Sequence, residues 1–186
     1  MSDHGTVDLF RQPTRRAKSH SAISGLSSPD RLPPHSPEAE QGVLGCILLS
    51  PVDCLPACVE AFKGGAEAFY DLRHRSIYEA MVKVADENPA FDLILLGQRL
   101  KDIGQLEAVG GATCLSSLLD AVPSPANLPY YLDIVKDKLL LRHILHVCGQ
   151  ATQWVYENPA DVAGLLDKVE KNVLLKIGRA SCRERV

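Results

Sequence analysis

The longest regular pattern of hydrophobic and polar positions begins after the proline-rich break at 123–125 and continues past Trp154. Its apolar side chains recur at helical spacings and include Leu128, Tyr131, Leu132, Val135, Leu139 and Ile144. We expect Asn127 to cap this helix and Pro129 to lie in its first turn, where the missing proline N–H costs little. A single helix cannot bury so broad an apolar face, so it needs a packing partner.

A second helix is predicted directly after the break at 157–159. Asn158 would cap it, Pro159 would take the first helical position and Asp161 would lie in the first turn. Its apolar stripe consists of Val162, Leu165, Leu166, Val169 and Val173. Two helices joined by a short turn form a helical hairpin. Apolar surface that one hairpin cannot cover is expected to meet another copy of the chain.

Five shorter helices are predicted upstream of the hairpin. The first starts with Ser36 as its cap, Pro37 at the first helical position, and Glu38 and Glu40 near the positive helix end. Three others are predicted over 51–62, 73–87 and 112–121. The fourth of the five is predicted between Asp92, its cap, and Gly104, its C-terminal stop. In the second of the five, the regular part is expected to begin at Pro56.

The apolar residues of these five helices define the expected core. The inward-facing side chains would include Ile77, Met81, Val84, Leu95, Leu96, Leu100, Ile103, Leu115, Leu118 and Leu119. Gly42 and Gly45 lie inside the first helix, where each costs roughly 1 kcal/mol relative to alanine. Close packing of a neighbouring helix is the better explanation for both.

Alternating runs typical of strands are few and short, so the predicted fold class is all-α: a small helical bundle followed by a long helical hairpin. The predicted organisation is a disordered tail over 1–31, a helical head over 32–121 and a hairpin over 122–175. The last stretch, 176–186, breaks the amphipathic pattern and resembles an in-frame translation of a common sequencing adapter. The natural reading frame is therefore expected to be lost near Lys176, and the chain to be the front end of a longer protein.

Composition narrows the function classes. Hydrophobic residues make up 46% of the 186 residues but aromatic residues only 5%, so aliphatic side chains must fill the core. A net charge of −3 argues against a strongly nucleic-acid-binding surface across the whole chain. No apolar signal core and no apolar run of the roughly 20 residues needed to span a membrane occurs. These features predict a soluble, cytoplasmic protein.

Local chemistry offers few candidate sites. The motifs GxxxxGK[ST], GxGxxG, HExxH and GxSxG are all absent from the sequence, so no catalytic residue, metal ligand or cofactor-binding residue is assigned. Cys46, Cys54 and Cys58 permit a metal-site interpretation, but buried cysteine acting as a small hydrophobe explains them better. His74 is either a functional histidine or one that satisfies groups at a helix start, and the second is favoured. Trp154 is expected either to anchor a partner or to pack within the hairpin.

Four blocks in order resemble the N-terminal domain of the bacterial replicative DNA helicase, the DnaB family. The first is Pro33-Pro34-His35 with Glu38-Ala39-Glu40-Gln41, Val43-Leu44-Gly45 and Leu48-Leu49. The second is Phe69-Tyr70, His74, Ile77-Tyr78 and Ala80. The third is Gly104, Leu106, Gly110-Gly111 and Leu115. The fourth is Val122-Pro123-Ser124, Ala126-Asn127, Tyr130-Tyr131, Ile134-Val135, Lys138 and Arg142. Cys114 departs from the family, which more often has an aromatic residue there.

The resemblance implies a function for the parent protein. In this family the hairpins pair, and the paired domains form a collar on a hexameric ring that receives the primase. A helicase loader is a further expected partner. ATP and Mg²⁺ would be bound by a downstream domain that also handles DNA and is absent from these 186 residues. The positions expected to serve hairpin pairing, its supporting core or partner binding are Tyr130, Tyr131, Ile134, Val135, Lys138, Arg142 and Trp154.

A different function class stays open. The chain could be a complete, non-catalytic helical adaptor that oligomerises and binds a replication partner. Reading the source DNA past the codon for Leu175 separates the two hypotheses, because a helicase requires an open frame that leads to GxxxxGK[ST].

Overall fold

A computed structural model describes residues 32–63, 65–157 and 161–174. The chain divides into two units, Met1–Leu32 and Pro33–Val186, and the description below concerns the second. Its elements are α1 (Pro37–Leu49), α2 (Pro51–Ala61), the 3-10 helix η1 (Gly65–Ala68), α3 (Leu72–Glu87), α4 (Leu93–Asp102), α5 (Gly111–Asp120), the 3-10 helix η2 (Pro125–Asn127), α6 (Leu128–Glu157) and α7 (Val162–Val173). No strand occurs in the described ranges, which confirms the predicted all-α class. The predictions for 1–31 and 176–186 lie outside the described residues.

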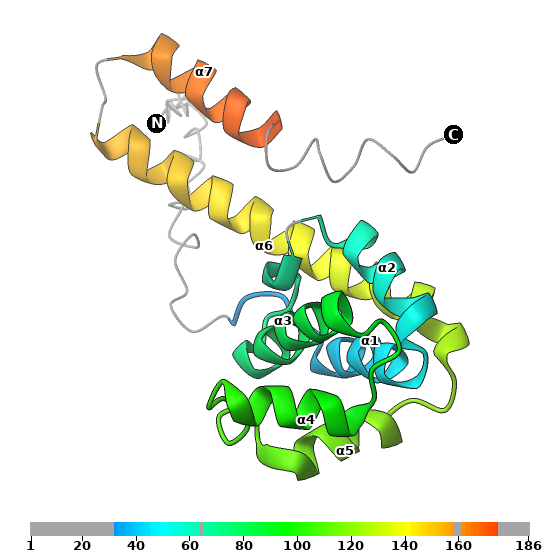
Figure 1. Cartoon of the computed structure of the whole chain (residues 1–186). Coiled ribbons are helices and arrows are strands. Elements are labelled where there is room, and N and C mark those ends of the chain that lie inside the picture. Colours follow the sequence, from blue (N-terminus) through cyan, green and yellow to red (C-terminus); the bar gives the residue numbers. More distant parts are fainter. Residues whose placement is uncertain (1–31, 64, 158–160, 175–186) are drawn as a thin grey trace, which may run out of the picture. The chain divides into compact units, whose positions relative to one another are not determined.

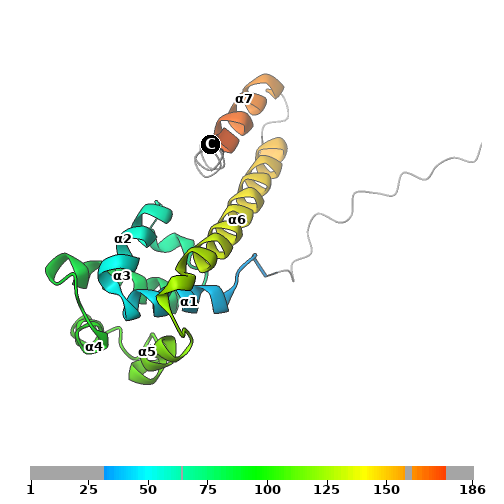
Figure 2. The same cartoon turned by 90° about the vertical axis from the view of Figure 1, so that its right-hand side faces the viewer.

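Helix α1 lies at the centre of the head, which we define as α1 to α5 (Figures 1 and 2). The predicted start is confirmed: Ser36 is the N-cap and its Oγ accepts a hydrogen bond from the N–H of Ala39 at 3.4 Å. Residues of α1 are buried on every side of the helix, because α2, α3, α5 and α6 all pack against it. A helix that is apolar all round is stable only in such a position.

Both glycines of α1 lie where another helix approaches closely. A Cβ atom at Gly42 would come within 2.8 Å of the ring of Tyr131 on α6. A Cβ at Gly45 would collide with the carbonyl oxygen of Leu118 on α5. The predicted explanation for these glycines, close packing of neighbouring helices, is therefore confirmed.

Two details of the head differ from the prediction. Leu96 and Leu100 are buried as expected, but Leu95 and Ile103 are each 42% exposed, because α4 is covered by α3 and α5 on one side only. Pro56 does not mark the start of regular helix in α2. That helix begins at Pro51, and Pro56 lies within it with an exposed side chain.

The caps of the two hairpin helices also differ from the prediction. Asn127 is the last residue of η2 rather than a side-chain cap, and the capping bond there comes from Ser124, whose Oγ accepts from the N–H of Ala126. Asp161 is the N-cap of α7 rather than a first-turn residue, and its carboxylate accepts from the N–H of Gly164 at 3.0 Å. The predicted roles of Asn158 and Pro159 fall outside the described residues.

Candidate interaction surface of the helical hairpin

The hairpin consists of α6 and α7, and the first half of α6 is part of the head core. Leu128, Leu132 and Val135 are buried, and α6 packs against α1, α2 and η1. The ring of Tyr131 fills the space left by the missing side chain of Gly42. The start of the hairpin is therefore held by the head through direct core packing.

The residues predicted for hairpin pairing or its supporting core differ in how deeply the structure buries them. Val135 is fully buried, and Tyr131 and Ile134 are half-buried against the same core. Lys138 is half-buried, whereas Tyr130 is 69% exposed. The first three thus contribute core packing, and Tyr130 is the one whose side chain faces solvent. No observation tests their part in an interface, which stays a prediction.

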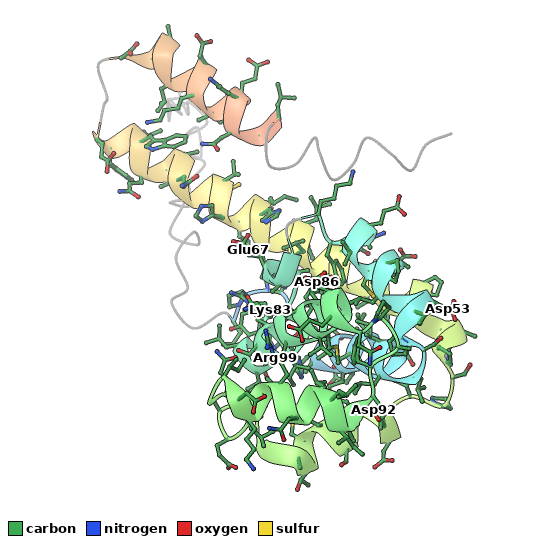
Figure 3. All side chains as sticks on the ribbon, in the orientation of Figure 1. Asp53, Glu67, Lys83, Asp86, Asp92 and Arg99 are labelled. Carbon is green, nitrogen blue, oxygen red and sulfur yellow. The ribbon has the colours of Figure 1, made fainter. Side chains whose placement is uncertain are left out.

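Arg142 fixes the middle of α6 to the head through backbone carbonyls. Its guanidinium donates to the carbonyl oxygens of Pro34 at 3.0 Å, Ala68 at 2.6 Å and Glu67 at 3.4 Å. Glu67, labelled in Figure 3, belongs to η1, which packs against α6. Burial lowers the pKa of Arg142, while Glu40 raises it and the positive charge of Arg75 lowers it further. Side chain to carbonyl bonds of this kind set the position of the long helix relative to the head.

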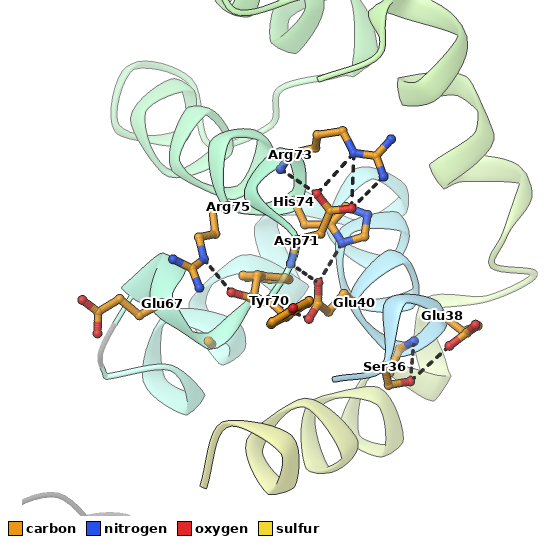
Figure 4. Close-up of polar contacts among 12 residues, drawn as sticks. Ser36, Glu38, Glu40, Glu67, Tyr70, Asp71, Arg73, His74 and Arg75 are labelled. Atoms are coloured by element: carbon orange, nitrogen blue, oxygen red, sulfur yellow. Dashed lines mark hydrogen bonds and ion pairs between the residues drawn. The ribbon is translucent and has the colours of Figure 1, made fainter. Parts of the chain in front are cut away.

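A buried polar cluster lies beneath this junction (Figure 4). The Glu40 carboxylate accepts hydrogen bonds from the backbone N–H groups of Tyr70 at 2.7 Å and Asp71 at 3.3 Å, and its Oε2 lies 2.8 Å from Nδ1 of His74. The side chains of Glu40 and His74 are almost fully buried. The ring of His35 stacks on Tyr70 with centroids 4.4 Å apart. The cluster joins α1, the segment before α3 and α3 itself.

This cluster is the feature that sequence reasoning missed. Glu40 was expected to complement a helix end, and His74 to satisfy nearby backbone groups. Their partnership spans 34 positions of sequence. The available signal was that both positions belong to the family-like blocks, but nothing local indicates that they meet.

The second half of α6 and all of α7 carry a largely exposed apolar surface. Trp154 packs inside the hairpin, where the Nζ of Lys168 lies 4.2 Å from its ring centroid. No residue of α7 is buried. The exposed large apolar side chains of the hairpin beyond Arg142 are Leu145, Val155, Tyr156, Val162, Leu166, Val173 and Leu174, with Leu141 just before them. We call these eight residues the hairpin apolar surface.

Other site types find no support in the part of the chain that the structure describes. No three or more His, Cys, Asp or Glu side chains gather there in a way that could hold a metal ion. None of the helices in that part is both long and apolar enough to cross a membrane. Cys46, Cys54 and Cys58 are buried core residues, as the packing interpretation predicts.

Comparison with known proteins decides the family. A family model described as the DnaB-like helicase N terminal domain matches residues 32–137, more than half of the chain. The chain belongs to this family. The predicted resemblance is confirmed, and the head with the first part of α6 is the portion that the family model covers.

Relatives of this DnaB-type domain agree with that assignment. The Replicative DNA helicase DnaB of Geobacillus stearothermophilus is 37% identical over 145 residues, which cover 78% of this chain and 31% of that protein. The Replicative DNA helicase DnaC of Bacillus subtilis (strain 168) is 36% identical with the same coverage. The crystal structure of the N-terminal domain of DnaB helicase from Mycobacterium tuberculosis matches with a TM-score of 0.69 and 32% identity, covering 76% of this chain and 99% of that one. The chain thus spans about a third of the length of the curated relatives it matches.

Proposed function

We propose that this DnaB-type domain is the assembly module of an ATP-dependent replicative DNA helicase that unwinds duplex DNA at the replication fork. The single observation that carries the assembly role is the hairpin apolar surface. Membership of the DnaB N-terminal family and relatives named replicative DNA helicases support the parent activity.

The physical reason for assembly is the exposure of large apolar side chains along both hairpin helices. Val162, Leu166 and Val173 are exposed on one side of α7, while Leu165 and Val169 on the adjoining side are half-buried. Each Å² of apolar surface removed from water contributes about 25 cal/mol. Monomeric proteins seldom leave large apolar patches uncovered. A second hairpin of the same kind would cover this surface, and repetition of the contact would build a collar on a hexameric ring.

The remaining parts of the proposal concern the whole protein. Primase and a helicase loader are its proposed partners, and ATP and Mg²⁺ would act in a domain downstream of the described residues. That domain would contact DNA, and the protein would work in the cytoplasm. These roles rest on the family and on the coverage of only 31% of the relatives' length.

Self-association is tested by measuring the molar mass of the purified 186-residue chain by light scattering coupled to gel filtration. We expect a dimer or larger species at micromolar concentration, and a monomer for Leu166→Ser, because that leucine is 64% exposed on α7. Ile94→Ser is the matched control, since Ile94 is 78% exposed on α4 of the head. A wild-type monomer, or loss of association in both variants, would reject the role of this surface.

The helicase assignment is tested separately. The chain alone should not hydrolyse ATP with or without single-stranded DNA, because its 186 residues contain no GxxxxGK[ST]. Reading the source DNA past the codon for Leu175 should reveal such a motif in frame. An early stop codon there would instead favour a non-catalytic adaptor.

A further inference from the structure

A groove of about 490 Å³ lies at the junction of α6, η1 and α3. Four cationic or imidazole side chains, Arg75, Arg142, His143 and His146, line it. Leu139 and Leu145 provide an apolar wall from the same helix α6. The size falls within the range of roughly 300–1,000 Å³ that is usual for small-molecule sites.

Two guanidinium groups in this groove lie close enough to repel each other. Burial is the main cause that lowers the pKa of Arg142; the Glu40 carboxylate raises that pKa, and the positive charge of Arg75 lowers it. Among the described residues, the ion pairs of Arg73 with Asp71, His74 with Glu40, Arg99 with Glu87 and Lys136 with Asp133 include neither groove arginine. The Glu67 carboxylate extends away from Arg75 (Figure 4). Glu67 lines the groove and the Glu40 carboxylate acts on Arg142, but in the described part of the chain neither acid forms a side-chain bond to the two arginines. Like charges without a directly paired carboxylate favour the binding of an anion.

Backbone carbonyls hold both guanidiniums in place while leaving donors available. Arg75 donates from Nε to the carbonyl oxygen of Phe69 at 2.6 Å. Arg142 donates from Nη1 and Nη2 to the carbonyl oxygens of Pro34, Ala68 and Glu67. A guanidinium has five N–H donors, so all four Nη donors of Arg75, together with the Nε donor and one Nη1 donor of Arg142, stay unused by these bonds. Donors that are fixed before a ligand arrives cost little to order on binding.

We propose that this groove binds a small organic oxyanion. Its carboxylate or phosphate group would accept hydrogen bonds from Arg75 and Arg142, with His143 and His146 beside it, and its apolar portion would lie against Leu139 and Leu145. Charge-assisted bonds from arginine suit both kinds of oxyanion. A nucleic-acid backbone fits less well, because Glu67 also lines the groove and the chain as a whole has a net charge of −3.

The proposal is tested by titrating the ¹⁵N-labelled 186-residue chain with citrate, glucose 6-phosphate and inorganic phosphate at constant physiological ionic strength. We expect saturable shifts of the amide signals at 67–69, 75 and 139–146 with the two organic probes. Inorganic phosphate should bind more weakly, because it has no part that contacts the leucines. Arg75→Gln should weaken binding of the organic probes about tenfold through the loss of a charge-assisted donor.

Arg73→Gln is the matched control, since Arg73 lies two positions away on α3 and is paired with Asp71. It should bind both organic probes as the wild type does. Should Arg75→Gln fail to fold, as judged by circular dichroism, His146→Gln replaces it, because His146 is exposed on α6 and its loss should also weaken binding. Shifts that do not saturate, or equal weakening by the Arg73 and groove variants, would overturn the proposal.

Discussion

Glu40 occupies the first turn of α1, where a carboxylate ordinarily faces water and complements the helix dipole. Here its side chain is buried, accepts hydrogen bonds from two backbone N–H groups and lies 2.8 Å from Nδ1 of His74. Breaking a buried pair by removing one partner is costly, because the other is left uncompensated. Glu40 therefore contributes more to the stability of the fold than an exposed carboxylate at the same helix position would.

Replacement of Glu40 by alanine should lower the free energy of unfolding by about 3–5 kcal/mol. The N–H groups of Tyr70 and Asp71 would lose their acceptor inside the protein. Glu40→Gln keeps an acceptor oxygen and should cost less. Urea unfolding followed by circular dichroism measures both, with Glu79→Gln on the exposed side of α3 as the control. Equal stability of the alanine variant and the control would show that the cluster contributes little.

Two glycine positions should respond to alanine in opposite directions. Gly45→Ala should destabilise the protein by about 1–3 kcal/mol, because its Cβ would meet the backbone of Leu118 and overpack the α1–α5 contact. Gly149→Ala should stabilise it by about 0.5–1 kcal/mol, since nothing lies within 4 Å of that Cβ and alanine favours the helix. Thermal unfolding of the two variants measures the contrast. A higher melting temperature for Gly45→Ala would contradict the packing explanation.

The same residues show what sequence could and could not predict at this scale. The close approach at Gly42 and Gly45 was predictable, because glycine inside an apolar helix is unfavourable without a packing reason. The caps were harder. Asp161 and Asn158 are both good N-cap residues three positions apart, and propensity alone does not choose between them. Likewise Ser124, not Asn127, makes the capping bond before α6, because a 3-10 turn intervenes.

At the scale of elements, a cluster of three thiols, Cys46 of α1 with Cys54 and Cys58 of α2, lies where these two helices pack together. Burial raises the pKa of Cys46 to about 11, and the neighbouring Cys54 adds to the shift. Burial likewise raises the pKa of Cys58 and of Tyr78 on α3. As the pH rises past the ordinary thiol pKa of about 8.5, the unfolded chain loses these protons before the folded one does. The stability contributed by the protonated thiols is present below that pH and falls above it.

We therefore expect the free energy of unfolding to be steady near neutral pH and to fall from about pH 9 upward. Cys46→Ala should lower the free energy of unfolding at every pH, because a buried side chain is truncated. It should also make the decrease of that free energy above about pH 9 less steep. Urea titrations in the presence of a reductant at about pH 7 and about pH 10 measure the difference. Cys148→Ser, at an exposed position of α6, should leave the slope unchanged. An identical slope in the Cys46 variant would argue against this linkage.

Helix α7 should unfold before the head. It has no buried residue, whereas the head has a continuous core. Trp154 is the only tryptophan of the chain and contacts α7 through Lys168, so its fluorescence reports the hairpin. At low protein concentration, we expect the fluorescence transition at lower urea than the circular dichroism transition. Lys168→Met should lower the free energy of unfolding of the hairpin by about 0.5–1 kcal/mol and move the fluorescence transition to still lower urea. Lys168→Arg should leave that transition where it is in the wild type. Coincident transitions in the wild type would contradict this separation.

Element boundaries were more predictable than element faces. Strong caps and breakers, such as Ser36 with Pro37 and Asp92 before α4, placed helix starts correctly. The prediction placed too many residues of α4 in the core. Leu95 and Ile103 fit the helical period, but they are exposed because neighbouring helices cover only one side of that short helix. Periodicity indicates which residues share a face, whereas coverage depends on where neighbouring helices lie.

At the scale of the whole molecule, two surfaces have different chemistry. The hairpin apolar surface suits another apolar surface, while the groove at the α6–η1–α3 junction suits an anion. The first was anticipated, because two amphipathic helices cannot cover stripes of this length by themselves. The second was not, because Arg75 and Arg142 are 67 positions apart in sequence and come together only through the packing of α6 on the head.

Pairing through the hairpin apolar surface makes hairpin stability depend on protein concentration. Association stabilises the docked hairpin by mass action, and a tenfold change in concentration corresponds to about 1.4 kcal/mol. The thermal midpoint reported by Trp154 fluorescence should therefore rise with concentration. Far-UV circular dichroism, dominated by the head, should change less. Leu166→Ser should remove the dependence because it places a hydroxyl in the contact, while Ile94→Ser should retain it. A wild-type midpoint that stays constant across a wide concentration range would mean that this surface does not pair, and the assembly role would have to be assigned elsewhere in the domain.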